Sequence, residues 1–141
     1  MNEKIAEYIR QVDYPGYINE RFPDVADYEE LVFENEDFHD IDWSKFPSSM
    51  NVFKKCNLDG LVLSPGQPIK IENSSARGMD IRGITAIIHA IESDFTGLKY
   101  DDETVLADSK DPSNIPSTFE KCLFDIETKN HFQQQGVVFK D

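Results

Sequence analysis

The chain contains 141 residues, of which 27 are acidic and 14 are basic, so its formal net charge is −13. This length is typical of a single domain with its own hydrophobic core, and two cysteines are too few for a disulfide scaffold. The acidic balance disfavours direct binding to nucleic acid, because contacts with phosphates require clustered Lys and Arg side chains.

Residues 1–30 are expected to form a short α-helical region that caps the rest of the fold. The apolar residues with the spacing of one helix face are Ile5, Tyr8, Ile9 and Val12. Pro15-Gly16 ends this pattern, and a second short helix is expected to begin at Asp24. Charged residues interrupt the segment, unlike in a signal peptide, and no apolar run of about 18 residues follows, so we expect a cytoplasmic protein.

From Leu31 the apolar residues repeat every five positions. Residues 31–65 divide into the blocks LVFEN, EDFHD, IDWSK, FPSSM, NVFKK, CNLDG and LVLSP, in which 11 of the 14 first and third positions are apolar, against 4 of the other 21. A helical period of 3.6 would drift out of phase with this repeat, and a strand period of 2 would invert its face at every block. The pattern predicts a solenoid in which each block places two side chains inward and then turns.

These blocks resemble the pentapeptide-repeat family, most closely in CNLDG at 56–60, with a small residue, then Asn, then a central Leu. The resemblance covers 31–65 best and returns at 93–107 and 117–126. It implies an all-β fold, namely a right-handed quadrilateral β-helix with four pentapeptides per coil, after a short α-helical N-terminal region. Ile41, Phe46 and Leu61 are larger than the residue that the family prefers at the first inward position, so distorted or looser coils are expected.

The β-helix is expected to span 31–141, with insertions at 66–92 and 108–116. The segment DSKDPSNIP at 108–116 has the composition of a surface loop. For 66–92 two interpretations are open: several isoleucines after residue 83 have helical spacing, whereas MDIRG, ITAII and HAIES at 79–93 follow the five-residue period. We favour continued β-helix.

In the later repeats, the residues expected to point inward are Phe95, Leu98, Tyr100, Val105, Phe119, Cys122 and Phe124. The tail at 136–139 is expected to add a last strand. VFKKCNL at 52–58 is echoed by TFEKCLF at 118–124, which predicts that Cys56 and Cys122 occupy equivalent buried positions rather than reactive or metal-binding ones.

No catalytic motif is apparent, so no enzymatic activity, cofactor or metal site is expected. His39, His89 and His131 lie far apart in the sequence without metal-ligand spacing. The cluster at 37–42 and the acids at 101–103 are the densest titratable groups, and solvated acidic faces are favoured over a cation site. The small-residue loop at 73–78 lacks the glycine pattern of a phosphate loop.

The acids expected to form a partner-binding face are Glu34, Asp37, Asp40, Asp42, Asp59, Asp94, Asp101 and Asp102. The pentapeptide-repeat family includes mimics of duplex DNA that inhibit DNA-handling enzymes, so the resemblance implies an inhibitor of a nucleic-acid-handling protein. In the sequence, Lys54, Lys55 and Lys70 separate the acids into two groups.

The alternative is an immunity or adaptor protein that binds through an acidic N-terminal surface, because residues 1–45 carry 13 acids against 4 bases. In both cases the expected partner is a basic protein surface, such as that of a DNA-binding enzyme, and neither nucleic acid nor membrane. The sequence leaves formation of a homodimer open.

Overall fold

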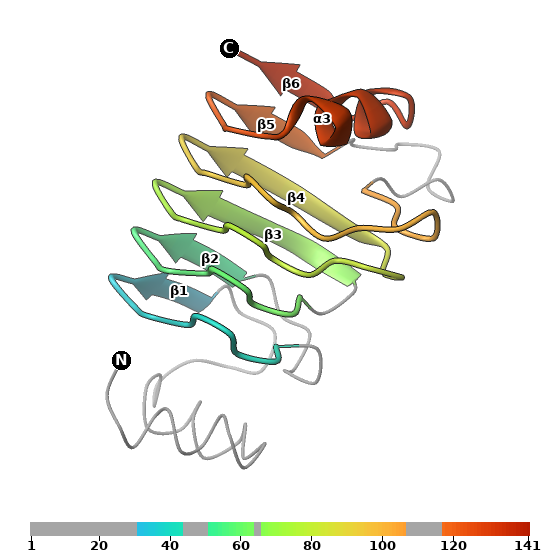
Figure 1. Cartoon of the computed structure of the whole chain (residues 1–141). Helices are drawn as coiled ribbons and strands as arrows, with labels where there is room; N and C mark the ends of the chain where they lie inside the picture. The colour runs from blue at the N-terminus through green and yellow to red at the C-terminus, as the bar shows by residue number, and fades with distance from the viewer. Residues whose placement is uncertain (1–30, 44–50, 64–65, 107–116) are drawn as a thin grey trace.

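The computed structural model describes residues 31–43, 51–63, 66–106 and 117–141, which form a solenoid of about four turns around one parallel β-sheet (Figure 1). The sheet has the strand order β1-β2-β3-β4-β5-β6, the same as the order in the chain. Its strands are β1 (Leu31–Glu34), β2 (Asn51–Lys54), β3 (Gly66–Glu72), β4 (Ala86–Ile91), β5 (Thr118–Glu120) and β6 (Val138–Lys140). The predicted β-solenoid is therefore confirmed, whereas the helical cap expected at 1–30 lies outside the described residues.

The strand register gives the length of each coil. Leu31 pairs with Asn51, and Thr118 pairs with Val138, so each of these coils is four blocks of five long. The coil from Asn51 to its partner Ile69 is two residues shorter, and the coil from Ile69 to its partner Ile88 is one residue shorter. These shorter coils explain why the five-residue pattern loses its phase in the middle of the chain.

The next coil is longer than four blocks. His89 pairs with Thr118, and the excess over the four-block length equals the length of the insertion predicted at 108–116. That segment itself lies outside the described residues. Residues 66–92 contain β3 and β4, which pair with each other and with β2 and β5. The structure thus continues the solenoid through this segment, and the alternative of an inserted helix does not hold.

The five-residue frame assigns some residues to the wrong side of the coil. In β4 the buried residues are Ala86, Ile88 and Ala90, so His89 and Ile91 lie on the outer face of the sheet. The reason is that β4 keeps the two-residue alternation of a strand over its whole length without a turn. In the same way Thr104 and Leu106 are buried in place of Val105, the residue that the frame places inward.

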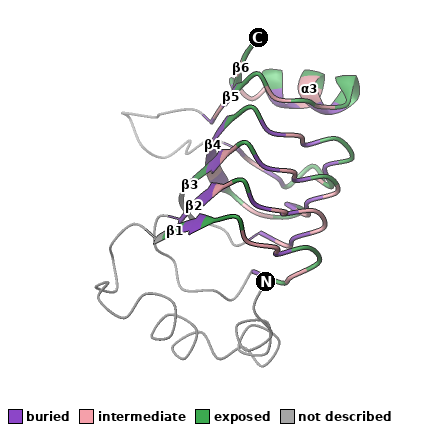
Figure 2. Cartoon of the chain, turned by 90° about the vertical axis from the view of Figure 1, so that its left-hand side faces the viewer, coloured by how far each residue is buried: buried purple, intermediate pink, exposed green. Residues whose placement is uncertain are grey.

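The core consists of side chains that stack from coil to coil. Phe33 and Phe53 are paired in the register and their rings stack with centroids 5.3 Å apart. At the other end Phe95 and Phe124 stack at 5.1 Å. Along the coils, buried residues alternate with half-buried and exposed ones (Figure 2). Because one repeat cannot cover its own apolar face, each coil is stabilised by its neighbours.

Turns between the straight segments use residues with positive φ. One such residue follows each strand from β1 to β5: Asn35, Lys55, Asn73, Glu92 and Lys121. A second series occupies the next turn of successive coils: Asp40, Gly60, Gly78 and Gly97. Positive φ costs little for glycine and is tolerated by Asn and Asp, so three of the four residues in the second series are glycines.

Cys56 and Cys122 occupy equivalent positions in their coils, as predicted, with Ser74 and Ser93 between them in the stack. Cys56 is buried as expected, whereas Cys122 is only half-buried. The amide of Cys56 donates to Ser74 Oγ, and the amide of Ser74 donates to Ser93 Oγ, each at 3.1 Å. Each serine hydroxyl in turn donates to the carbonyl two residues earlier. These small side chains fill the corner that follows the strand and satisfy its buried backbone groups.

Helix α3 (Ile126–Gln133) is not predicted by the sequence pattern. It packs the buried ring of Phe132 against Tyr100, with ring centroids 5.1 Å apart. Gln135, just after the helix, donates to the carbonyl of Thr104 at 2.9 Å and accepts from the amide of Leu106 at 3.2 Å. The chain then enters β6, which is the last strand expected at 136–139.

Candidate functional site

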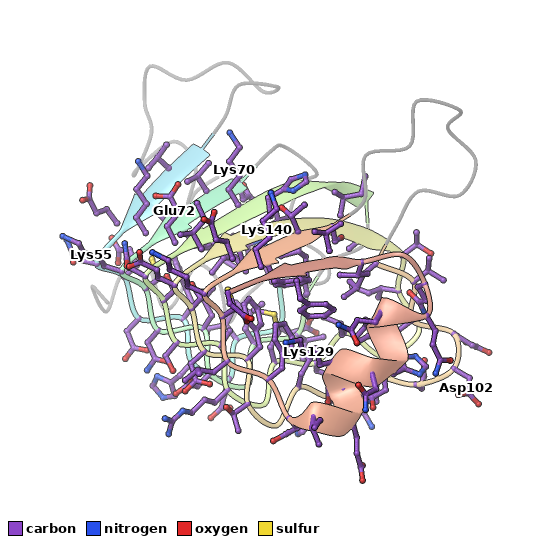
Figure 3. All side chains as sticks on the ribbon, turned by 90° about the horizontal axis from the view of Figure 1, so that it is seen from above. Lys55, Lys70, Glu72, Asp102, Lys129 and Lys140 are labelled. Carbon is purple, nitrogen blue, oxygen red and sulfur yellow. The ribbon has the colours of Figure 1, made fainter. Side chains whose placement is uncertain are left out.

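Acidic side chains concentrate on one part of the solenoid. We use the name turn surface for residues 36–43, 56–63, 74–85 and 93–105, which contain 10 acids against 3 bases, whereas the six strands contain 3 acids and 3 lysines. Figure 3 shows this separation, with Lys70, Glu72 and Lys140 on the outer face of the sheet and Asp102 well away from it. In the described coils, the negative charge is thus greater on the turns than on the strands.

Asp37 and His39 form the first turn of this surface. Asp37 Oδ1 accepts a hydrogen bond from the amide of His39 at 3.1 Å and lies 2.8 Å from His39 Nδ1. The hydrogen bond with the imidazole lowers the pKa of Asp37, and the same carboxylate raises the pKa of His39. Asp40 and Asp59 raise the pKa of His39 further. The amide of Asp40 donates to the carbonyl of Asp59 at 2.8 Å, so the turns of these two coils adjoin.

Asp59 and Asp94 connect successive coils. Asp59 accepts hydrogen bonds from Ser75 Oγ at 2.6 Å and from the amide of Arg77 at 2.9 Å. Asp94 accepts from the amide and hydroxyl of Thr96 and from Arg77 Nε, the last at 2.6 Å. Burial opposes ionisation of Asp94, but these hydrogen bonds outweigh it and lower its pKa. Both carboxylates therefore help to hold the turns together as well as contributing charge.

Asp40 and Asp42 are exposed on the same part of the turn surface. Asp40 stands in the turn with a φ of 57°, stacked on the glycine of the next coil, Gly60. Asp42 forms a parallel bridge to Val62, one coil further on. The bridges therefore place Asp37 and Asp94 in one column of the turn surface, three coils apart, and Asp42 in the neighbouring column.

Asp101 and Asp102 lie at a different turn. Asp101 Oδ1 accepts hydrogen bonds from the amides of Gly83 and Glu103, both at 3.0 Å. The Gly83 amide makes the largest contribution to lowering the pKa of Asp101, so this carboxylate stays ionised. Asp102 is exposed beside it. Glu34 is separate from all the others, because it ends β1 on the sheet side, in register with Lys54.

Two arginines interrupt the acidic surface between these groups. Arg77 pairs with Asp94, and Arg82 pairs with Asp80 through two contacts, Nε to Oδ1 at 3.0 Å and Nη2 to Oδ2 at 2.8 Å. The lysines at 54, 55 and 70, which the sequence suggests as the interruption, belong instead to strands β2 and β3 and to the turn directly after β2. The arginines were detectable in principle, because they are one five-residue block apart and so fall in successive turns.

The outer face of the sheet carries a groove of about 300 Å³. Its lining comes from β3 to β6: Lys70, Glu72, His89, Ala90, Ile91, Thr118, Glu120 and Lys140. His89 Nδ1 lies 2.9 Å from Thr118 Oγ1 at the bottom of this groove. Partial burial, assisted by the nearby Lys70 ammonium, lowers the pKa of His89. The five-residue frame turns His89 and Ile91 inward, so it does not predict the groove.

Burial raises the pKa of both Cys56 and Cys122, so the thiols are protonated at neutral pH and weakly nucleophilic. Within the described ranges, no three His, Cys, Asp or Glu side chains are grouped closely enough to hold a metal ion. Nor does the described part of the chain contain a helix with the length and apolarity needed to cross a bilayer.

Comparison of the chain with protein-family models, with curated proteins and with solved structures gives no match.

Proposed function

We propose that this protein is a right-handed quadrilateral β-helix of the pentapeptide-repeat type that binds a basic protein surface through its acidic turn surface. The most specific form of the proposal is a DNA-mimic inhibitor that occupies the DNA-binding groove of a nucleic-acid-handling protein. The observation that supports it is the separation of charge, with 10 acids against 3 bases on the turn surface and equal numbers on the strands.

The density of charge on the turn surface supports this form of the proposal. Its seven net negative charges extend over four coils, which span roughly 19 Å if coils are spaced like neighbouring strands at about 4.8 Å. This corresponds to one charge per roughly 2.7 Å, against about one per 1.7 Å along duplex DNA. The two densities differ by less than a factor of two, so a groove that attracts DNA would also attract this surface.

The fixed geometry of the carboxylates also supports the proposal. Asp37, Asp94 and Asp101 accept hydrogen bonds from the turns, which lower the pKa of each and restrain its side chain. A partner therefore meets charges that are already positioned, so less side-chain entropy is lost on binding.

The test uses immobilised full-length protein to retain a DNA-binding enzyme from bacterial lysate, with and without excess duplex DNA. The proposal predicts that duplex DNA displaces the retained enzyme, and that purified enzyme binds more weakly as salt increases. The double variant D40N/D102N should weaken binding at least tenfold. The matched control E34Q/E92Q removes the same two charges away from the turn surface and should bind like the unmodified protein.

Retention of a partner that duplex DNA does not displace would contradict the DNA-mimic form. A loss of binding that is equal in D40N/D102N and E34Q/E92Q would show that only net charge matters, and would contradict a role for the turn surface itself.

The second candidate function is an immunity or adaptor protein that uses the acidic N-terminal residues. It is favoured by one observation, the 13 acids against 4 bases at residues 1–45. In the full-length protein, Asn and Gln substitutions of the acids within residues 1–30 distinguish the two functions. Loss of binding in this variant, with D40N/D102N unaffected, would support the second candidate.

A further inference from the structure

The groove on the outer face of the sheet differs in chemistry from the turn surface. Its side chains belong to two rows that cross β3, β4 and β5 in register. One row contains Lys70, His89 and Thr118, and the other contains Glu72, Ile91 and Glu120. The rows are two residues apart along the strands, or about 6.6 Å, and neighbours within a row are about 4.8 Å apart.

The first row offers donors to a negatively charged group. Lys70 is exposed and is close enough to His89 to lower the pKa of the imidazole. His89 Nδ1 and Thr118 Oγ1 are 2.9 Å apart. With the imidazole proton on Nδ1, His89 donates to Thr118 Oγ1, and the hydroxyl proton of Thr118 is then available to a ligand. A carboxylate in this row would pair with the Lys70 ammonium and accept a hydrogen bond from Thr118.

The second row offers carboxylates on either side of an apolar surface. Glu72 and Glu120 occupy the strands on both sides of Ile91, two strand spacings or about 9.6 Å apart, and Lys140 ends the row on β6. Ile91 is 41% exposed between the glutamates. Among the described residues, neither glutamate has a cationic partner within ion-pair distance. The ammonium group of a ligand would lie between the two carboxylates, and an apolar side chain next to that ammonium would pack against Ile91.

We propose that this groove binds a small zwitterion whose ammonium and carboxylate lie about 7 Å apart, such as a dipeptide with an apolar N-terminal residue. Two residues of extended chain span about 7 Å, which matches the separation of the rows. A volume of about 300 Å³ accommodates a ligand of this size. Lys70 would repel a simple cation, and the two glutamates would repel a simple anion, so the groove favours a ligand with both charges.

The experiment measures binding to the full-length protein by NMR titration and calorimetry with three probes that differ in their terminal charges. Leu-Gly carries both charges, N-acetyl-Leu-Gly lacks the ammonium, and Leu-Gly-amide lacks the carboxylate. We expect Leu-Gly to bind at least tenfold more tightly than either blocked probe, with shifts in the resonances of His89 and Ile91. Failure of Leu-Gly to bind at millimolar concentration, or equal binding of the three probes, would overturn the proposal.

Two variants test which row of the groove binds the ammonium of the ligand and which binds its carboxylate. E120Q should remove most of the advantage of Leu-Gly over N-acetyl-Leu-Gly, and K70M should remove most of its advantage over Leu-Gly-amide. The control E34Q changes the same outer face away from the groove and should leave all three affinities unchanged. Equal losses for every probe in E120Q would contradict the assignment, and the probe series on the unmodified protein remains decisive if a variant does not fold.

Discussion

Single carboxylates in this protein contribute both to turns and to surface charge. Asp37 accepts from the amide two residues later, as do Asp80, Asp94 and Asp101 in their own coils. An aspartate side chain is the right length to close such a turn and remains ionised while doing so. Substitution by a longer acid would keep the charge and lose the turn.

The histidines provide a direct test of these local environments. Because Asp37 raises the pKa of His39 and burial lowers that of His89, we expect NMR titration to show His39 losing its proton at higher pH than His89. D37N should bring the pKa of His39 down toward its ordinary value of 6.5. An unchanged His39 titration in D37N would contradict the pairing.

The same shifts fix the direction of the pH dependence of stability. His39 has a raised pKa in the folded protein, so its protonated form stabilises the fold. This stabilisation is complete below about pH 6.5 and is lost as pH rises through the pKa that His39 has in the folded protein. His89 has a lowered pKa, so its ionisation destabilises the fold as pH falls below about 6.5. Urea unfolding from pH 5 to 8 should show the first effect disappear in D37N and the second disappear in H89Q.

Two glycines in equivalent turns should respond differently to alanine. Gly78 has a φ of 65° and an added Cβ would meet nothing, so G78A should cost only the backbone strain, about 1 to 2 kcal/mol. Gly60 has a φ of 69°, and its added Cβ would also collide with the carboxylate of Asp40, an exposed side chain that must turn away, so G60A should cost slightly more. In a D40G background the cost of G60A should fall to that of G78A, as measured by urea unfolding; an unchanged cost would exclude the collision.

Among the secondary-structure elements, α3 is the one that the local sequence does not reveal. Only Thr128 and Phe132 of the helix are buried, so its apolar face is too narrow to produce a helical pattern in the sequence. The helix is stabilised by its contacts with the last coil, through Phe132 and Gln135. The strands, by contrast, were predictable because most of their inward residues are large and apolar.

This difference predicts the effect of substitutions in α3. F132A should destabilise the protein by about 3 to 5 kcal/mol, because it removes a fully buried ring. I126A, in the same helix, should change stability by less than about 0.5 kcal/mol, since Ile126 is 74% exposed. Urea unfolding of the two variants checks this, and equal losses would mean that the helix does not dock on the coil as described.

Over the molecule as a whole, the net charge of −13 opposes folding while it favours encounter with a basic partner. The paired arginines, Arg77 and Arg82, reduce repulsion in the middle of the turn surface at the expense of its continuity. Stability and partner binding are therefore expected to respond oppositely to salt.

We expect the urea midpoint to rise as NaCl is increased from 0.05 to 0.5 M, because screening weakens repulsion between carboxylates over distances beyond about 5 to 10 Å. The double variant R77Q/R82Q should be less stable at low salt and should gain more from added salt. It should also bind the basic partner more tightly, since two of the three bases on its turn surface are removed. A variant whose stability is unaffected by salt would contradict this account of the arginines.

The order of apolar and polar residues along the chain was enough to predict the solenoid, the equivalence of the two cysteine positions and the final strand. It was enough because a five-residue alternation records which residues point inward. The same pattern placed Asp37 and Asp40 in one exposed turn. It did not show that Glu34 lies on the sheet side, apart from the other acids.

Which residues meet between coils was settled by the folded arrangement alone. The pairing of Arg77 with Asp94, the outward position of His89 and the two rows of the groove depend on the register between coils of unequal length. A local period does not encode that register, because shortening a coil by one residue moves every later side chain to a new neighbour and shifts the phase of the five-residue pattern.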